Sequence, residues 1–157
     1  MTAALFAFLL SIQTPQQAPR QPIPFSHRQH AGALKLPCKM CHQPAPDSGE
    51  AMTLPEASRC MECHSAIKTE SPSIRKLAAM AKQGTDIDWA PVYELPSYVK
   101  FAHQPHLDSG AACATCHGKV EERDQLYREV DLNMGTCMDC HRTKRATIAC
   151  NACHEKR

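Results

Sequence analysis

The chain has 157 residues and a mass of 17.4 kDa, a length that fits one domain or two small ones. It carries only 1 Trp, 3 Tyr and 4 Phe against 12 Pro, so few large side chains are available for a core of its own. The formal net charge of +2 and the 22% of charged residues argue against a basic nucleic-acid binder and against a membrane bundle.

Residues 1–21 contain an apolar run of 10 residues, interrupted only by Ser11, and then a Pro- and Gln-rich linker. Because a helix needs about 20 apolar residues to cross a bilayer, the run resembles the apolar region of an export signal, although no Lys or Arg precedes it. We expect an exported chain that contacts a membrane only through a complex or through an uncleaved N-terminus.

All ten cysteines lie in CxxC pairs, and a histidine follows each pair at once. In chain order these five motifs are Cys38, Cys41, His42; Cys60, Cys63, His64; Cys113, Cys116, His117; Cys137, Cys140, His141; and Cys150, Cys153, His154. This is the attachment signature of c-type haem: the two thiols form thioethers to the haem vinyl groups, and the histidine binds the iron. The sequence therefore predicts five covalently bound haem c groups.

Zinc binding and a disulfide framework are the alternatives for so many cysteines. Ten thiolates would fill two and a half four-thiolate zinc sites, and an even cysteine count also permits disulfides in an exported chain. Neither alternative gives a role to the five adjacent histidines, so haem is the favoured interpretation.

The four remaining histidines lie in a repeated F-x-H-x-x-H pattern. Phe25, His27 and His30 recur 76 residues later as Phe101, His103 and His106, and the first two CxxCH motifs recur at nearly the same offset. We interpret this as a duplicated two-haem module, with the distal iron ligands His27, His30, His103 and His106. The modules span 22–70 and 98–157, and the second has the extra motif at Cys150.

Residues 71–97 connect the two modules. Ser71 and Pro72 fit the start of a helix and Gly84 fits its end, so the spacing predicts a helix over 72–83. The Pro-interrupted stretch 89–96 is expected to be extended, and residues 121–130 fit either a short helix or a hairpin arm. Short helical turns are expected at the CxxCH motifs. The predicted fold is therefore mostly irregular with short α-helices, built around haem.

The pattern resembles the class III multihaem cytochromes c and their three-haem relatives. From Pro22 to His154 it is also similar to the pentahaem cytochrome subunit of bacterial alternative complex III, on Pro24 to His27, Trp89 to Pro96 leading into His103, and Met134 to Cys137. This resemblance implies an electron-transfer role in a quinol-oxidising respiratory complex, on the periplasmic face of the bacterial inner membrane. Implied partners are quinol-oxidising, iron–sulfur or molybdopterin-type subunits and small cytochromes.

Five irons need five distal ligands, and only four histidines remain. The resemblance implies that each His pair serves two haems, which leaves one iron of the second module over. Met134 is our candidate for its sixth ligand, because the first module has Ala57 at that position; packing against porphyrin is the other role open to Met134. Met80 and Met52 are weaker candidates.

Electron transfer without catalysis is the favoured function, and no catalytic residue is assigned. Bis-histidine ligation gives low-potential iron, and methionine raises the potential, so the haems could form a wire. About ten propionates would turn the apoprotein charge of +2 negative. The alternatives are a soluble periplasmic shuttle and a multihaem reductase of a nitrogen or sulfur oxyanion, which needs an open iron with acid–base groups beside it.

Overall fold

The computed structural model describes residues 18–45 and 51–154, so the apolar run at residues 3–12 lies outside the described residues. Short helices joined by irregular chain make up the described part. They are η1 (Arg28–Ala33), α1 (Cys38–Cys41), α2 (Ala57–His64), α3 (Pro72–Gln83), α4 (His103–Asp108), α5 (Cys113–His117), η2 (Val120–Glu122), α6 (Met134–Lys144) and α7 (Cys150–Cys153). This confirms the predicted fold class.

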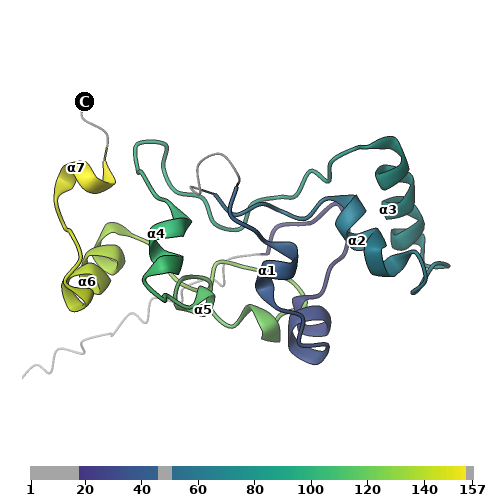
Figure 1. Ribbon diagram of the computed structural model, residues 1–157, viewed down its shortest axis with the longest axis horizontal. Helices are drawn as coiled ribbons and strands as arrows, with labels where there is room; N and C mark the ends of the chain where they lie inside the picture. The colour runs from purple at the N-terminus through teal and green to yellow at the C-terminus, as the bar shows by residue number, and fades with distance from the viewer. Residues whose placement is uncertain (1–17, 46–50, 155–157) are drawn as a thin grey trace, which may run out of the picture.

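Extended pairing is limited, within these described ranges, to two isolated antiparallel bridges, Pro44 with Met52 and Val99 with His154. None of the described helices is both long enough and apolar enough to span a membrane. Along the longest axis of the molecule the elements run from α7 and α6, through α4 and α5, to α1, α2 and α3 (Figure 1). Chain order and spatial order therefore differ, since α1 lies between α5 and α2.

The predicted connector helix is confirmed as α3, which begins at Pro72 and ends before Gly84. Gly84 has φ 62°, the left-handed conformation that glycine adopts without steric cost at a helix end. Ser71 occupies the N-cap position, but its hydroxyl makes no capping hydrogen bond. Residues 89–96 are extended or irregular, as expected, whereas residues 121–130 form neither a helix nor a hairpin arm beyond the turn at η2.

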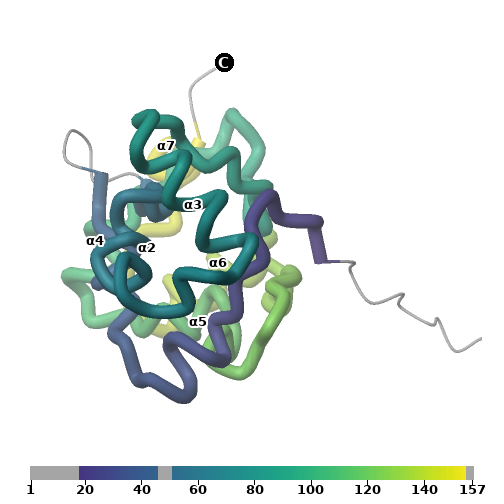
Figure 2. Tube along the Cα trace, turned by 90° about the vertical axis from the view of Figure 1, so that its right-hand side faces the viewer, coloured from purple at the N-terminus to yellow at the C-terminus, as the bar shows by residue number. Residues whose placement is uncertain are grey.

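A small hydrophobic core lies at the α2 and α3 end of the molecule, which faces the viewer in Figure 2. Its buried members within the described part of the chain are Ile23, Ala57, Ile74, Leu77 and Ile87. Trp89 packs against them and donates its indole N–H to the carbonyl oxygen of Pro55 at 2.9 Å. The remainder of the described chain builds no comparable core, so packing of aliphatic side chains stabilises only this end.

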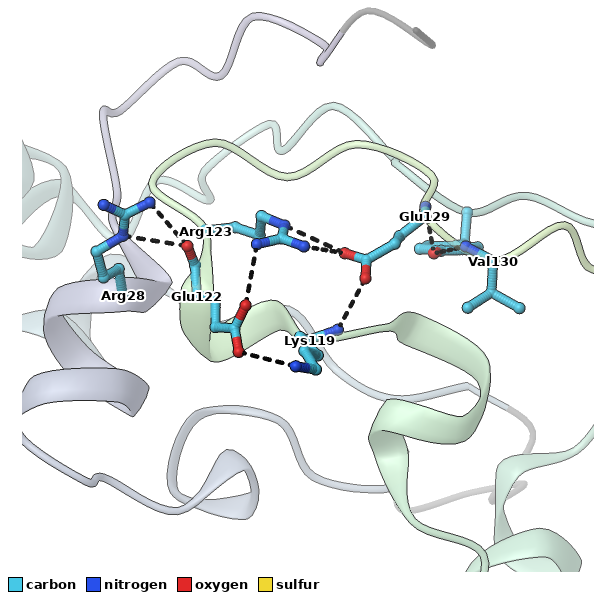
Figure 3. A network of polar contacts seen from close by, with 7 residues as sticks. Arg28, Lys119, Glu122, Arg123, Glu129 and Val130 are labelled. Atoms are coloured by element: carbon cyan, nitrogen blue, oxygen red, sulfur yellow. Dashed lines mark hydrogen bonds and ion pairs between the residues drawn. The ribbon is translucent and has the colours of Figure 1, made fainter. Parts of the chain in front are cut away.

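The two modules contact each other where η1 packs on η2. The backbone N–H of Arg28 donates to the carbonyl oxygen of Arg123 at 2.8 Å, and the Arg28 guanidinium donates to that of Glu122 at 2.8 and 3.1 Å. Beyond η2, Arg123 pairs with Glu129 at 3.0 Å (Figure 3). These polar contacts connect a helix of the first module to a turn of the second.

Replacing Gly32 by alanine is expected to open this junction, because an added Cβ would collide with the carbonyl oxygen of Glu121. Backbone on both sides must then shift, an overpacking cost of about 1–3 kcal/mol. We expect Gly32→Ala to lower the free energy of unfolding of the haem-loaded protein by this amount in denaturant titrations. Ala33→Ser, at the exposed neighbouring residue, serves as the control. Equal stability of the two variants would contradict the close approach.

Candidate haem sites

Each CxxCH motif forms one helical turn, as expected. The second and fourth motifs lie inside the longer helices α2 and α6, and the others make up α1, α5 and α7 with their flanking histidines. In α6 the side chain of Asn133 accepts a hydrogen bond from the backbone N–H of Thr136 at 3.0 Å, a capping contact that fixes the start of the helix. A helical turn places both thiols of a motif and its histidine around one centre, as haem attachment requires.

Four of the five motif histidines have one distal histidine opposite them. The ring centres are 6.3 Å apart for His27 and His42 and 6.3 Å for His103 and His117, with planes within 5° and 8° of parallel. The other two pairs are His30 with His64 at 6.2 Å and His106 with His141 at 6.0 Å. Each of the four spare histidines therefore lies opposite a different motif histidine. The first histidine of each F-x-H-x-x-H pattern faces one motif of its module, and the second faces the next motif.

These separations fit an iron held between two imidazoles. A metal–imidazole bond is about 2.0–2.1 Å long, so two rings on opposite sides of one metal have centres about 6 Å apart once the distance from nitrogen to ring centre is added. Direct ring stacking or a hydrogen bond between the two rings would bring the centres closer. The residues present thus fit bis-histidine haem at the first four motifs.

Backbone carbonyls orient several of these imidazoles. The Nδ1 atoms of five histidines lie within hydrogen-bonding distance of carbonyl oxygens: His30 to Ser26 (2.9 Å), His42 to Thr53 (3.0 Å), His64 to Ile67 (2.9 Å), His106 to Ala102 (2.8 Å) and His141 to Thr147 (2.6 Å). A ring whose Nδ1–H donates to a carbonyl carries its lone pair on Nε2. That lone pair is the one an iron binds.

The aromatic residue of each F-x-H-x-x-H pattern packs against its two histidines. Phe25 lies 4.8 Å from the ring centre of His27 and 4.4 Å from that of His30, and Phe101 is placed in the same way against His103 and His106. Phenylalanine has no polar atom to compete for the imidazole nitrogens. Its role is therefore to hold both rings in position.

Burial favours the neutral form of one imidazole at the first site, His27, and of one at the third, His117. Burial, followed by the nearby His42 and His30, lowers the pKa of His27 to about 4. Burial, with His103 and His42 as further causes, also lowers the pKa of His117. A neutral ring is required for ligation, so both residues are competent ligands at neutral pH. Because His42 of the first motif helps to lower the pKa of His117 of the third, these two sites are neighbours.

The thiols of different motifs also lie close together. Burial and then the neighbouring Cys113 thiol, which makes a side-chain hydrogen bond with Cys38, raise the pKa of Cys38. Burial likewise raises the pKa of Cys60, with Cys41 as a further cause. In the second module the neighbours are Cys140 beside Cys116 and Cys153 beside Cys137. The five motifs therefore form a continuous cluster.

The fifth motif histidine has a tyrosine, rather than a histidine, beside it. The rings of Tyr98 and His154 have centres 6.0 Å apart, and their strands are held together by the Val99–His154 bridge and by the Lys100 N–H to Cys153 carbonyl hydrogen bond of 2.8 Å. The sequence analysis missed Tyr98. The repeat contained a signal for Tyr98. The first module has Pro22 at the corresponding position, and only the second module has the additional CxxCH motif at Cys150.

The three candidate methionines lie in different environments. Met134 is the first residue of α6 and is 66% exposed. Met80 packs against the hydrophobic core, and Met52 pairs with Pro44 in an isolated bridge. Tyr93 of the connector, also missed, contacts His117 edge-on with ring centres 4.9 Å apart, and its hydroxyl accepts the backbone N–H of Glu129 at 2.9 Å.

Comparison with known families assigns each half of the chain to a cytochrome type. A model of the class III cytochrome C family matches residues 10–85, and a model of cytochrome c7 and related cytochrome c matches residues 99–155. Together with the five motifs, these matches show that the chain contains two multihaem cytochrome modules in tandem, the first of the class III type and the second of the c7 type. It is an electron carrier with covalently bound haems.

A relative of defined function matches most of the chain. The chain is 28% identical over 162 residues to the "Menaquinone reductase, multiheme cytochrome c subunit" of Nitratidesulfovibrio vulgaris strain Hildenborough. The match covers 86% of this chain and 77% of that protein. The expected class of multihaem cytochrome is thus confirmed, and the name of the relative specifies a menaquinone reductase rather than alternative complex III.

Proposed function

We propose that this chain is the haem subunit of a respiratory complex that exchanges electrons with the quinone pool. The observation that carries the proposal is the set of four imidazole pairs at 6.0–6.3 Å, spread over both modules. Closed bis-histidine sites favour electron transfer over substrate chemistry, because a reductase needs an iron position open to its substrate. Each haem, when bound, supplies an iron that accepts and releases one electron.

The chain's own residues prepare these sites for electron transfer. The phenylalanines and backbone carbonyls fix the imidazoles in place before and after each transfer, which keeps reorganisation small. We further propose five haems in all, attached through the cysteines and held by the histidines named above, with module boundaries at 22–70 and 98–157 and a periplasmic location that follows from c-type haem attachment.

The relative supports the quinone partner. Its name specifies menaquinone reduction, whereas the resemblance to the subunit of alternative complex III implies quinol oxidation. A multihaem subunit that exchanges electrons with a quinone-handling subunit would serve either direction. We propose this shared arrangement, with iron–sulfur, molybdopterin-type or small cytochrome subunits as further redox partners.

Purification of the tagged holoprotein from its own host under mild detergent tests this function. We expect it to copurify with a quinone-handling subunit, and its haems to be reduced by a menaquinol analogue or reoxidised by the quinone in that complex. A monomeric holoprotein that exchanges electrons only with soluble cytochromes would instead show the periplasmic shuttle. Turnover of nitrite or sulfite by the purified chain would show the reductase and overturn the proposal.

The sixth ligand of the fifth iron is proposed to be Met134. Met134 lies one helical turn before Cys137 and therefore on the same face of α6, and Cys137 neighbours Cys153 of the fifth motif. Tyr98 is the competing residue because its ring lies beside that of His154.

Two matched substitutions separate these residues. We expect Met134→Ala to convert one haem to a high-spin form and to lower its reduction potential, since methionine ligation raises the potential. Tyr98→Phe, which removes only a hydroxyl, is expected to leave the spectrum unchanged. Optical spectra and a potentiometric titration of both holoproteins measure this. The reverse result would assign the position to Tyr98 and contradict Met134 ligation.

A further inference from the structure

The five haem sites follow a spatial order that differs from their order in the sequence. We propose that they form one unbranched line in which the second motif (Cys60) and the fifth motif (Cys150) are the two ends, with the first, third and fourth motifs between them. Electrons would then enter at one of these ends and leave at the other. This deepens the proposed electron-transfer function and rests on it.

The central step of the line is the contact between the first and third motifs. The η1–η2 contact brings these two motifs together, and the Cys38 thiol interacts with that of Cys113 and the His117 ring with that of His42. Each motif cysteine would be bonded to a vinyl group at the edge of its haem, so two neighbouring sulfurs would bring two haem edges together. The pairing of η1 with η2 and the Arg28 hydrogen bonds to residues 122 and 123 hold this junction.

The outer steps follow from the same kind of contact. Cys41 of the first motif neighbours Cys63 of the second, Cys116 of the third neighbours Cys140 of the fourth, and Cys137 of the fourth neighbours Cys153 of the fifth. The ribbon agrees with this sequence of contacts. Along the longest axis, α7 and α6 precede α5, and α1 precedes α2 (Figure 1).

The distal histidines fit this line. Within the first module, His27 faces the first motif and His30 faces the second, so two ligands three residues apart serve an interior site and a terminal site. The second module repeats this with His103 on the third motif and His106 on the fourth. Phe25 and Phe101, each between two such histidines, therefore lie along the line as well.

The two ends differ in their surroundings, which suits two different partners. The second motif lies beside the hydrophobic core, where Cys60 and Met61 pack against the buried cluster of α2 and α3. The fifth motif lies on the short helix α7, next to the exposed ring of Tyr98. Partners docked at the two ends would be separated along the longest axis of the molecule (Figure 1).

A pair of variants from the same F-x-H-x-x-H pattern tests the order. His27→Ala removes the distal ligand of an interior site, and His30→Ala removes that of a terminal site; the thioethers remain in both. In NMR-monitored redox titrations of the holoproteins, we expect His27→Ala to shift the midpoint potentials of two other haems and His30→Ala that of only one. If the haems instead followed the sequence order, the first would lie at an end. His27→Ala would then shift the potential of one other haem and His30→Ala those of two, and this result would overturn the proposal.

The wild-type holoprotein gives an independent reading in case either variant is unstable. We expect through-space NMR contacts between substituents of the haems on the first and third motifs, and none between those on the second and third. Contacts between the second and third haems would overturn the order while leaving electron transfer intact. Failure of electron transfer itself appears separately, as haems that are neither reduced nor reoxidised by redox partners.

Discussion

The chain produced without haem is expected to show no cooperative unfolding transition, whereas the holoprotein unfolds cooperatively. Five buried apolar side chains at one end of the described structure cannot offset the conformational entropy of a chain this long, about 1–2 kcal/mol for each ordered residue. The ten cysteines outside this core are exposed or only partly buried without haem, so bound haem would have to supply most of the missing interior. Binding free energy of the cofactor therefore becomes folding free energy, as in metal-dependent domains.

The measurement is a denaturant titration followed by far-UV circular dichroism and by fluorescence. Trp89 is the single tryptophan and lies against the small core, so its emission reports on the one region that could stay folded without haem. We expect a gradual change in both signals for the apoprotein. A sigmoidal apoprotein transition with the same midpoint in both signals would contradict the haem-dependent fold.

Replacing His103 by alanine is expected to have the largest effect of any single distal substitution. His103 faces His117 at the third motif, the central site of the proposed line, so its loss leaves that iron five-coordinate. We expect about one fifth of the haem absorbance to become high-spin and to bind carbon monoxide or cyanide. We also expect slower electron passage from one end of the protein to the other, since every path crosses this site.

Gln104→Ala is the matched control for His103→Ala. Gln104 is the next residue of α4, is exposed, and uses its side-chain amide to donate to Asp108 at 2.7 Å. The control is expected to keep the wild-type spectrum and rates. If His103→Ala also keeps a fully low-spin spectrum and binds no added ligand, the pairing of His103 with the third iron is wrong.

Candidate haem-binding residues can be named from the sequence because their chemistry is local. A CxxCH motif contains both attachment points and the proximal histidine within five residues, and the F-x-H-x-x-H repeat marks His27, His30, His103 and His106 as candidate distal ligands, which the structure places opposite motif histidines. The connector helix was equally accessible, because Pro72 and Gly84 mark its ends. In each case the signal lies within a short window of sequence.

The partners of these residues could not be predicted, because they depend on contacts across the chain. Nothing local in the sequence indicates that Cys38 meets Cys113, or that Gly32 must be small where η1 approaches η2. Tyr98 and Tyr93 were missed for the same reason: each acts through a distant partner, His154 or His117. Residues 121–130 also departed from the expected pattern, because their ion pairs and contacts with η1 replace regular hydrogen bonding.

The most direct test is the haem content of the purified, exported protein, measured by its pyridine haemochrome spectrum together with its intact mass. Five covalent haems per chain are predicted, one for each CxxCH motif, with the mass of the polypeptide raised by five haem groups and no free thiol at any of the ten cysteines. A chain that carries no haem and instead binds zinc or forms disulfides through these cysteines would contradict the account.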